Sequence, residues 1–554
     1  METNHRNNPY DNVYPNNPDN NSAYSDAPYS MQPIAGATKQ EDNVFTKRLK
    51  EHFPFFGLGS ALYALFYTFC LYKNASGITY PFFVIGTLCY FFFSMRKLGV
   101  PYKKDSVFYI VSLVLLGISN CLTNSGPLLF MNKCGIFLLA FLLMIHTVYQ
   151  DGNWNFPKYF CALAETFGVT VTCVFRPFSD MVSYFDAQKQ QKNSKKSYFI
   201  PILIGIAITI PLLFVMTLLL ASADAVFSNM LDSILDAFNF ATIFRICFLM
   251  IAVFFCSYAI CAALGMKIVK EEVTDHRVLE PVIAIIVTAA LSVLYLMFSV
   301  IQILYLFIGN MQLPEGYTYS SYAREGFFQL LAVCILNLII VLICLYLFRD
   351  NRALKVILTI ISGCTFIMIL SSALRMLMYI NRYNLTFLRI FVLWALAVIF
   401  LLMAGVTIFI YMNRFPLFTY SMIIVTVFYI GLSFAHPDYW IAKYNLKPVH
   451  MEYLNDYDIN DSQQYLYRLS ADAAPILLNE KTNPYLRQNI VGDVDAMEII
   501  RNWDDVTQYE VMEEGIIEEL KWLRRYYSKM DGLYDDMHVR SFNFAIFTAG
   551  KYVN

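Results

Sequence analysis

Between residues 53 and 434 the sequence is a succession of apolar runs, most of them close to the roughly 20 residues that a helix needs to cross a bilayer. Such runs restrict the fold severely, because in lipid every backbone amide and carbonyl has to find its partner within the structure itself. The composition agrees, since 57% of the 554 residues are hydrophobic and only 15% are charged. We therefore expect an all-α, polytopic transmembrane helical bundle.

We predict about eleven membrane-spanning helices from the length and apolar character of these runs. They lie at residues 53–72, 78–95, 107–122, 128–149, 199–221, 242–266, 281–308, 327–348, 355–380, 388–411 and 416–434. Residues 43–434 are therefore expected to form one transmembrane helical domain.

Lys and Arg gather in alternate connections between these segments, and an excess of them marks the cytoplasmic side of a membrane. The basic set contains Lys47, Arg48, Lys50, Arg96, Lys97, Lys103, Lys104, Lys189, Lys192, Lys195, Lys196, Lys267, Lys270, Arg277, Arg349, Arg352 and Lys355. The other set offers little beyond Lys73, Lys133, Arg324 and Arg382, and its connection at 222–241 is acidic. The N-terminus is therefore predicted to be inside the cell and the C-terminus outside.

Residues 159–185 are apolar enough to resemble one more span, but their apolar side chains recur every three or four positions and so follow one helical face. A helix of this kind lies on a membrane surface. If it crossed instead, Lys189 and every later basic connection would move outside, against the charge distribution. We therefore predict an interfacial helix on the cytoplasmic side.

Polar segments flank the apolar region. Residues 1–42 are rich in Asn, Pro, Asp and Tyr and have almost no aliphatic side chains to bury, which predicts a disordered cytoplasmic tail. Residues 435–554 are charged throughout and predict a C-terminal, soluble, extracytoplasmic helical domain, with helices at 461–478 and 505–530. His436-Pro437-Asp438 matches the J-domain signature, but that motif works between two soluble helices, and here it directly follows a span.

The sequence contains no catalytic or metal-binding signature. There is no HExxH, GxSxG, Walker loop or GxGxxG, and the 12 cysteines lie between Cys70 and Cys364 without a CxxC pair. We therefore assign no catalytic residue, metal or cofactor. The formal net charge of -1 also gives no electrostatic case for a nucleic-acid partner.

Most of the predicted spans have no ionisable residue near their centres, and the polar residues there are uncharged. Ser112, Ser119, Gln302 and Asn337 are of a kind that usually bonds neighbouring helices rather than a substrate. A proton- or sodium-coupled carrier would need carboxylates near the midplane, and their absence from these spans argues against that class.

Charged and tyrosine side chains instead gather at one predicted depth, near the outer leaflet, although they come from different helices. This outer-leaflet layer consists of Asp224, Arg245, Tyr319, Tyr322, Arg324, Arg375, Tyr379 and Arg389. Arg binds carboxylate or phosphate through its planar fork. The layer therefore predicts either a salt-bridge network between helices or a binding site for an anionic lipid or a small anionic ligand.

Several runs resemble a bacterial polytopic membrane family catalogued as a domain of unknown function (DUF4173/DUF4153-like). They are LLASADAVFSNML (219–231), TYSSYAREGFFQLLAV (318–333), SALRMLMYINRYNLTFLR (372–389), HPDYWIAKYNL (436–446), YRLSADAAPILL (467–478) and VRSFNFA (539–545). The chain departs from the family pattern at His436, where the pattern has Asn. The resemblance implies a bacterial plasma-membrane protein and places Arg324, Arg375 and Arg389 at motif positions, but it implies no activity.

Three functions stay open on this basis. We favour a non-enzymatic protein for sensing, scaffolding or envelope maintenance, with an outward-facing polar crevice and the lipid bilayer as its surroundings. The alternative is a transporter of a lipid or small molecule that uses the crevice as an entrance. An intramembrane enzyme ranks last, because no nucleophile-base pair or metal set is evident.

Overall fold

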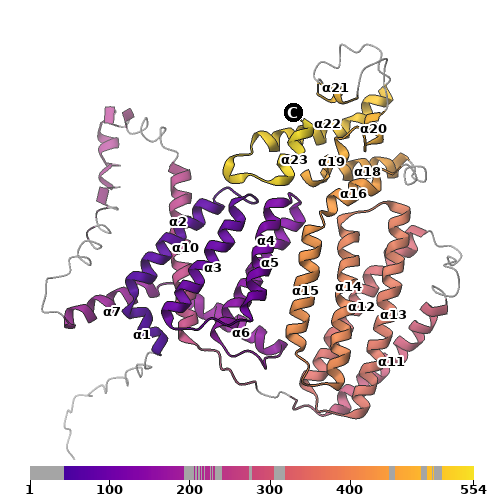
Figure 1. Ribbon diagram of the computed structural model, residues 1–554, viewed down its shortest axis with the longest axis horizontal. Coiled ribbons are helices and arrows are strands. Elements are labelled where there is room, and N and C mark those ends of the chain that lie inside the picture. Colours follow the sequence, from indigo (N-terminus) through magenta and orange to yellow (C-terminus); the bar gives the residue numbers. More distant parts are fainter. Residues whose placement is uncertain are drawn as a thin grey trace, which may run out of the picture. The chain divides into compact units, whose positions relative to one another are not determined.

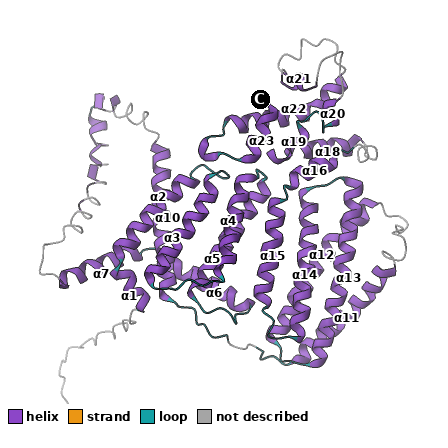
Figure 2. Ribbon diagram, in the orientation of Figure 1, coloured by secondary structure: helices purple, strands orange, loops and turns teal. Residues whose placement is uncertain are grey.

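The computed structural model describes residues 43–191, 240–273, 277–304, 319–447, 456–487, 496–501, 503 and 514–553, with scattered positions between 205 and 230. The compact unit that begins at residue 43 is helical, and no strand occurs among the described residues (Figure 2). The predicted all-α class is therefore confirmed. The predicted tail, residues 1–42, lies outside the described part.

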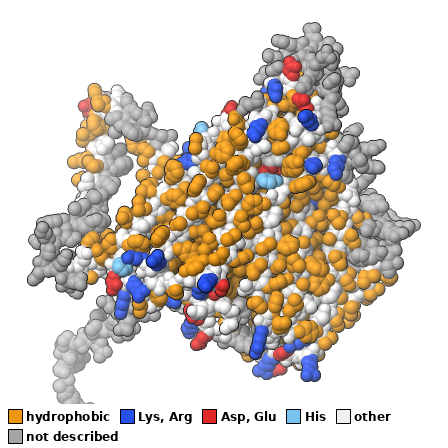
Figure 3. Space-filling view, viewed as in Figure 1, with side chains coloured by type: hydrophobic (Ala, Val, Ile, Leu, Met, Phe, Trp, Pro, Cys, Tyr) orange, Lys and Arg blue, Asp and Glu red, His pale blue; other side chains and the backbone are white. Residues whose placement is uncertain are grey.

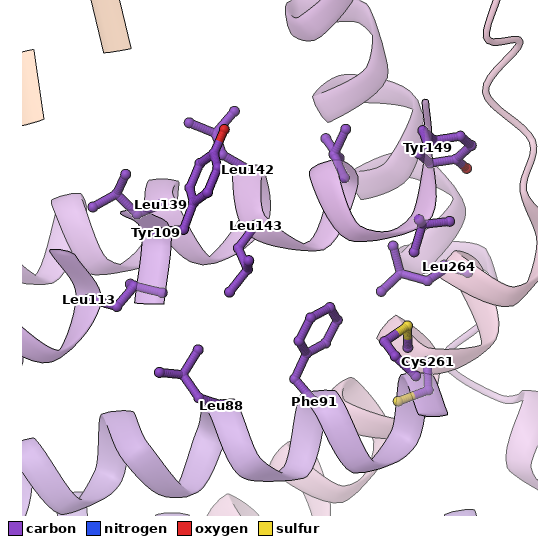
Figure 4. Packing of buried hydrophobic residues seen from close by; sticks show 14 of the residues in the cluster. Leu88, Phe91, Tyr109, Leu113, Leu139, Leu142, Leu143, Tyr149, Cys261 and Leu264 are labelled. Carbon is purple, nitrogen blue, oxygen red and sulfur yellow. The ribbon is translucent and has the colours of Figure 1, made fainter. Parts of the chain in front are cut away.

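A first group of helices comes from the N-terminal half of the chain. Four of its members follow one another as neighbours, and α10 packs against α2 (Figure 1). Leu88 and Phe91 of α3 face Leu113, Leu143 and Leu264 of three other helices in the core of this group (Figure 4). The helices are α1 (Val44–Glu51), α2 (Phe53–Leu71), α3 (Thr79–Leu98), α4 (Ser106–Leu122), α5 (Gly126–Val148) and α10 (Phe240–Met266).

A second group of helices packs around α13, which contacts α11, α12 and α14. Its core is formed by buried side chains such as Leu358, Met376 and Leu396. The bridge between the groups is α15, which contacts α4 on one side and α14 on the other. The helices are α11 (Pro281–Gln302), α12 (Tyr319–Leu347), α13 (Arg352–Tyr383), α14 (Phe387–Tyr411) and α15 (Leu417–Phe434).

Eight of the described helices are long and apolar enough to cross a membrane, namely α2, α5 and α10 to α15. The apolar helix α4 is shorter, with 17 residues. Hydrophobic side chains cover the surface of the bundle between its charged ends (Figure 3). This is a multi-pass membrane protein. The predicted count of eleven spans stays a prediction, and most of its segment 199–221 lies outside the described residues.

The predicted interfacial segment consists of two helices rather than one. These are α6 (Phe156–Thr172) and α7 (Arg176–Gln191), with a bend of 64° between them. Pro177 explains the break, because in a continuous helix its ring would clash with the carbonyl of Cys173, whereas in the first turn of α7 it is tolerated. Phe160, Phe167 and Phe175 are exposed. An apolar exposed side is what a membrane-facing segment requires.

Polar side chains inside the bundle join neighbouring helices, as predicted for three of the four positions. Asn337 of α12 donates a hydrogen bond to Thr365 of α13 (2.9 Å). Ser371 of α13 donates to Gln302 of α11 (2.6 Å), and Ser119 of α4 lies 2.6 Å from the hydroxyl of Ser433. For Ser112 the contact is different, since its hydroxyl donates to the carbonyl of Phe108 in its own helix.

The C-terminal helices have a core of their own, which includes Leu466, Ile476, Tyr526 and Met530. Leu520 and Leu523 of α22 are buried, as the periodicity predicts, while residues 504–513 lie outside the described part. The elements are α16 (Pro437–Asn445), α18 (Asp456–Arg468), η2 (Ala471–Ala473), α19 (Ala474–Leu477), α20 (Pro484–Arg487), α21 (Ala496–Arg501), α22 (Glu514–Asp535), η4 (Val539–Ser541) and α23 (Phe544–Val553).

Candidate functional site

The C-terminal helices meet the end of the bundle at three of its loops. At the α2–α3 loop, Arg540 donates to the carbonyl of Tyr72 (3.0 Å). At the α13–α14 loop, Asn445 accepts from the backbone amide of Leu385 (2.7 Å) and donates to its carbonyl (2.9 Å). The α4–α5 loop carries the third contact, which is built from charged side chains.

Asp472 is the centre of that third contact. It lies in the short helix η2, is only 7% exposed, and accepts hydrogen bonds from the hydroxyl of Thr123 (2.7 Å) and the backbone amide of Asn124 (3.0 Å). A buried carboxylate is costly unless donors satisfy it. The α4–α5 loop of the bundle supplies two of these donors. It thereby satisfies a buried carboxylate that belongs to the C-terminal helices.

His436 supplies the next partner, because its Nδ1 lies 2.7 Å from Oδ1 of Asp472. The residue stands between α15 and α16 with a φ of 46°, in the left-handed region that side chains other than Gly seldom adopt. Pro437 opens α16 directly after it, and a residue before proline avoids the right-handed helical conformation. This sharp change of direction places the imidazole beside Asp472.

Ser470 joins a second carboxylate to the first. Its hydroxyl lies 2.6 Å from Oδ2 of Asp438 and 2.8 Å from Oδ2 of Asp472, and its backbone amide donates to Asp438 (3.3 Å). A serine hydroxyl carries only one hydrogen, so it donates to only one of the two carboxyl groups. A proton on one carboxyl group would complete the second contact. We call His436, Asp438, Ser470 and Asp472 the acid-histidine cluster.

The electrostatics of the cluster favour bound protons. Burial raises the pKa of Asp438 above its ordinary value, and the charge of Asp472 adds to this effect, while hydrogen bonds from Ser470 act against it. The hydrogen bond to Asp472 raises the pKa of His436, against the opposing effect of burial. Both groups therefore hold a proton more tightly than they would in water.

A polar pocket of about 230 Å³ lies beside the cluster. Positive charge comes from Arg468 and Lys529, and the Nζ of Lys529 donates to the carbonyl of Leu469 (2.7 Å). The pocket is lined by Asn124, Gly126, Pro127, Phe387, Asp438, Tyr465, Arg468, Leu469, Ser470 and Lys529. It is therefore a small cavity with charges of both signs, at the junction of the bundle and the C-terminal helices.

The chemistry of this arrangement is that of a protonatable contact. The hydroxyl of Ser470 is hydrogen-bonded to both carboxyl groups, and the imidazole of His436 is hydrogen-bonded to Asp472. Among the residues that the structure describes, no group of three or more His, Cys, Asp or Glu is arranged to hold a metal ion. The cluster is suited to hold, release and sense protons at a docking surface.

Part of the predicted outer-leaflet layer is brought together at the α13–α14 turn. The guanidinium carbon of Arg389 lies 4.2 Å from the ring centroid of Tyr379, and its Nη1 donates to the carbonyls of Tyr383 and Asn384. Arg375, one turn before Tyr379, is buried and donates to Gln302 of α11 (3.1 Å). These side chains connect α11, α13 and the start of α14.

Other members of the layer are placed elsewhere. Arg245 is exposed on α10, and Asp224 is exposed and accepts from the backbone amide of Val226 (2.8 Å). Tyr319, Tyr322 and Arg324 fall in the first two turns of α12, where the side chains lie outside the described part. The ligand-binding role of the layer stays a prediction.

Sequence reasoning missed the acid-histidine cluster, although two signals pointed toward it. His436 and Asp438 belong to the tripeptide that resembles a J-domain signature, and they directly follow the last predicted span. All four residues also lie within two of the motifs that carry the family resemblance, HPDYWIAKYNL and YRLSADAAPILL.

A smaller polar cluster lies at the opposite end of the bundle, where α5 leads into α6. Asp151 is 2.8 Å from Nδ1 of His146 and accepts from the hydroxyl of Tyr159 (2.7 Å). Burial on its own would raise the pKa of Asp151, but these hydrogen bonds and the charge of Lys103 lower it. The cluster fixes the entry of the chain into α6.

Comparison with models of protein families shows to which family the chain belongs. Residues 110–480 match the model described as a domain of unknown function, DUF4153. The chain belongs to the DUF4153 family. This confirms the resemblance found in the sequence. The region shared with DUF4153 extends from α4 beyond α19 and includes the whole acid-histidine cluster. Neither the curated proteins nor the solved structures contain a match to this chain.

Proposed function

We propose that the protein is a non-enzymatic membrane sensor or scaffold, in which the C-terminal helices dock on the outward end of the bundle and their docking responds to protons or to a bound ligand. The acid-histidine cluster carries this proposal. It places two buried carboxyl groups and a half-buried histidine where loop α4–α5 and the C-terminal helices share hydrogen bonds. In this proposal, the polar pocket beside the cluster corresponds to the predicted outward-facing crevice.

The proposal includes a bacterial plasma-membrane location, eleven spans, a cytoplasmic N-terminus and an extracytoplasmic C-terminal domain. Hydrogen bonds at the two ends of α3 support this orientation in the membrane. Arg48 donates to the carbonyl of Leu98 at one end of α3 (2.9 Å), and Asn74 donates to the carbonyl of Arg540 near its other end (3.1 Å). Basic connections thus lie at the end opposite to the C-terminal helices, as the charge rule requires.

Cysteine labelling tests the orientation with two matched variants. Ser528→Cys on α22 and Ser179→Cys on α7 both introduce a thiol at an exposed position. A membrane-impermeant maleimide applied to intact cells is expected to label the first variant and to label the second only after lysis, with unmodified protein as the control for native cysteines. The reverse pattern would invert the topology and overturn the proposal.

The docking role is tested in the cell of origin with a variant that is inserted at the normal level. Asp472→Ala is expected to reproduce the envelope defect of a deletion strain, measured as uptake of an impermeant dye. Asp535→Asn, at an exposed position of α22, is the matched control and is expected to behave as wild type. Full complementation by Asp472→Ala would contradict a function based on docking.

A transporter of a lipid or small molecule is the second candidate, because the structure has a polar pocket at the junction with the C-terminal helices and an apolar cleft in the bundle. The packing of the two cores by aliphatic side chains argues against a continuous polar path between the two ends. Reconstituted protein is therefore expected to leave fluorescent lipids in the leaflet where they started. Protein-dependent loss of leaflet asymmetry would favour the transporter instead.

A further inference from the structure

An apolar cleft lies further along two of the helices that line the polar pocket. Pro127 and Phe387, at the starts of α5 and α14, line the polar pocket. Phe130 and Trp394, which lie about one and two turns further along these helices, line a cleft of about 450 Å³. Residues spaced by three, four or seven positions share one side of a helix, so the lining residues of both cavities lie along the same sides of α5 and α14.

The cleft has the character of a site for a hydrocarbon chain. On α5 its lining extends from Phe130 to Leu142, and Val406 of α14 and Phe418 of α15 also line it. From Phe130 to Leu142 the helix rises about 18 Å, which is more than half of the roughly 30 Å of a bilayer's hydrocarbon core. A single acyl chain from one leaflet could therefore lie along it, whereas water would find almost no polar partners there.

The polar pocket has the character of a site for a phosphate-containing head group. Arg468 and Lys529 bring two positive charges, and an arginine fork suits phosphate oxygens. The carbonyl of Leu469 accepts from Lys529 and keeps its ammonium group at the wall of the pocket. Asp438 also lines the pocket and offers an acceptor to an amine or hydroxyl group. The pocket therefore matches a head group that joins a phosphate to a hydrogen-bond donor.

We propose that the polar pocket and the apolar cleft together bind one phospholipid, with its phosphate between Arg468 and Lys529, its amine or hydroxyl group toward Asp438, and an acyl chain between α5 and α14. This inference rests on the proposed function in so far as the C-terminal helices must be docked to form the pocket. It assigns a ligand to that docking surface. A bound lipid would then connect the bilayer directly with the acid-histidine cluster.

Native mass spectrometry of the purified full chain tests the head-group site. With phosphatidylethanolamine, phosphatidylglycerol and phosphatidylcholine added in equal amounts, we expect retention of the first two over the third, whose quaternary ammonium has no N–H donor. Arg468→Gln is expected to lower retention about tenfold, because it removes a charge-assisted contact. Arg525→Gln removes an exposed arginine of α22 and should leave retention unchanged. Equal retention of all three lipids by the wild type and Arg468→Gln would overturn the proposal.

A second variant tests the acyl-chain site and separates a lipid from free phosphate. Leu138 lines the cleft on α5, so Leu138→Trp is expected to fill it and to lower lipid retention. Leu62→Trp, at an exposed position of α2, is the matched control. If Leu138→Trp retains lipid normally, or if inorganic phosphate at millimolar concentration displaces the lipid from the wild type, the acyl-chain assignment is wrong.

Hydrogen exchange on the same samples measures docking of the C-terminal helices separately from the retention of lipid. Protected C-terminal helices without a retained phospholipid would overturn the lipid site and leave the docking role intact. Retained phospholipid in a protein whose C-terminal helices exchange freely would contradict the docking role instead.

Discussion

The hydroxyl of Thr123 donates a hydrogen bond to the carboxylate of Asp472 across 349 positions of the sequence. The contact brings the α4–α5 loop of the membrane bundle against η2 of the C-terminal helices. Since both residues are buried, neither can exchange this partner for water without a loss of free energy. Under the proposed function, docking of the C-terminal helices depends on this contact and on the acid-histidine cluster around Asp472.

Asp472→Ala is expected to destabilise the docked state by about 3 kcal/mol, because it leaves His436 and the donors of the α4–α5 loop without their acceptor. The measurement is hydrogen exchange of residues 456–487 in detergent-solubilised protein. Asp535→Asn serves as the control for loss of an exposed carboxylate on α22. Unchanged protection in Asp472→Ala would show that the cluster does not hold the docked state.

A rise in pH is expected to weaken docking. The pKa of His436 is raised above its ordinary value of 6.5, so the folded protein binds this proton more tightly than the unfolded chain does. The resulting stabilisation is complete below 6.5 and disappears as pH rises through the folded pKa. Asp438, whose pKa is also raised by burial, acts in the same direction. Thermal unfolding and hydrogen exchange between about pH 5.5 and about pH 8.5 measure the effect.

His436→Asn separates the histidine from the rest of the cluster. An amide can still donate to Asp472 but does not titrate, so the variant is expected to keep its docking at neutral pH and to lose most of the slope above about pH 6. The control is His52→Asn, an exposed histidine at the other end of the bundle. A variant with the wild-type slope would show that another group is the sensor.

The helices of this protein could be predicted from sequence because every segment that spans the lipid must satisfy its backbone hydrogen bonds within the protein. Long apolar runs such as Phe387–Tyr411 can satisfy their backbone only as helices, so the all-α class follows from composition and length. The break between α6 and α7 is also visible in the sequence at Pro177. There the apolar periodicity on both sides of the proline suggested a continuous helix.

The acid-histidine cluster could not be predicted, because nothing local to His436 or Asp472 indicates that they meet. The two residues are separated by 36 positions, and their partner Thr123 belongs to a loop between two spans. Depth in the membrane, by contrast, can be estimated from topology, and this led to the outer-leaflet layer. Residues at the same depth need not be neighbours. Among the side chains of that layer that the structure describes, Tyr379 and Arg389 are in direct contact.

The approach of the C-terminal chain to the α2–α3 loop predicts a steric effect at Gly77. A Cβ atom there would lie 2.9 Å from the carbonyl oxygen of Arg540 and 2.9 Å from Cα of Ser541, and both atoms belong to the backbone. Gly77→Ala is therefore expected to destabilise the docked state by about 1–3 kcal/mol. Gly152→Ala, with no atom within 4 Å of the added Cβ, should change stability by less than about 0.5 kcal/mol. Equal thermal stability of the two variants would contradict this close contact.

Substitution of Arg389, at the α13–α14 turn, is expected to change the stability of the protein rather than its binding of a ligand. Arg389→Lys keeps the charge but loses the planar fork that contacts Tyr379 and the carbonyls of Tyr383 and Asn384, so we expect a loss of about 1 kcal/mol in stability. Retention of phospholipid should be unchanged, because the proposed lipid site does not include this residue. Arg414→Lys, at an exposed position, is the control for the exchange itself. If Arg389→Lys instead releases phospholipid while its thermal stability stays normal, the predicted layer is a binding site, and the lipid has to be placed at the α13–α14 turn.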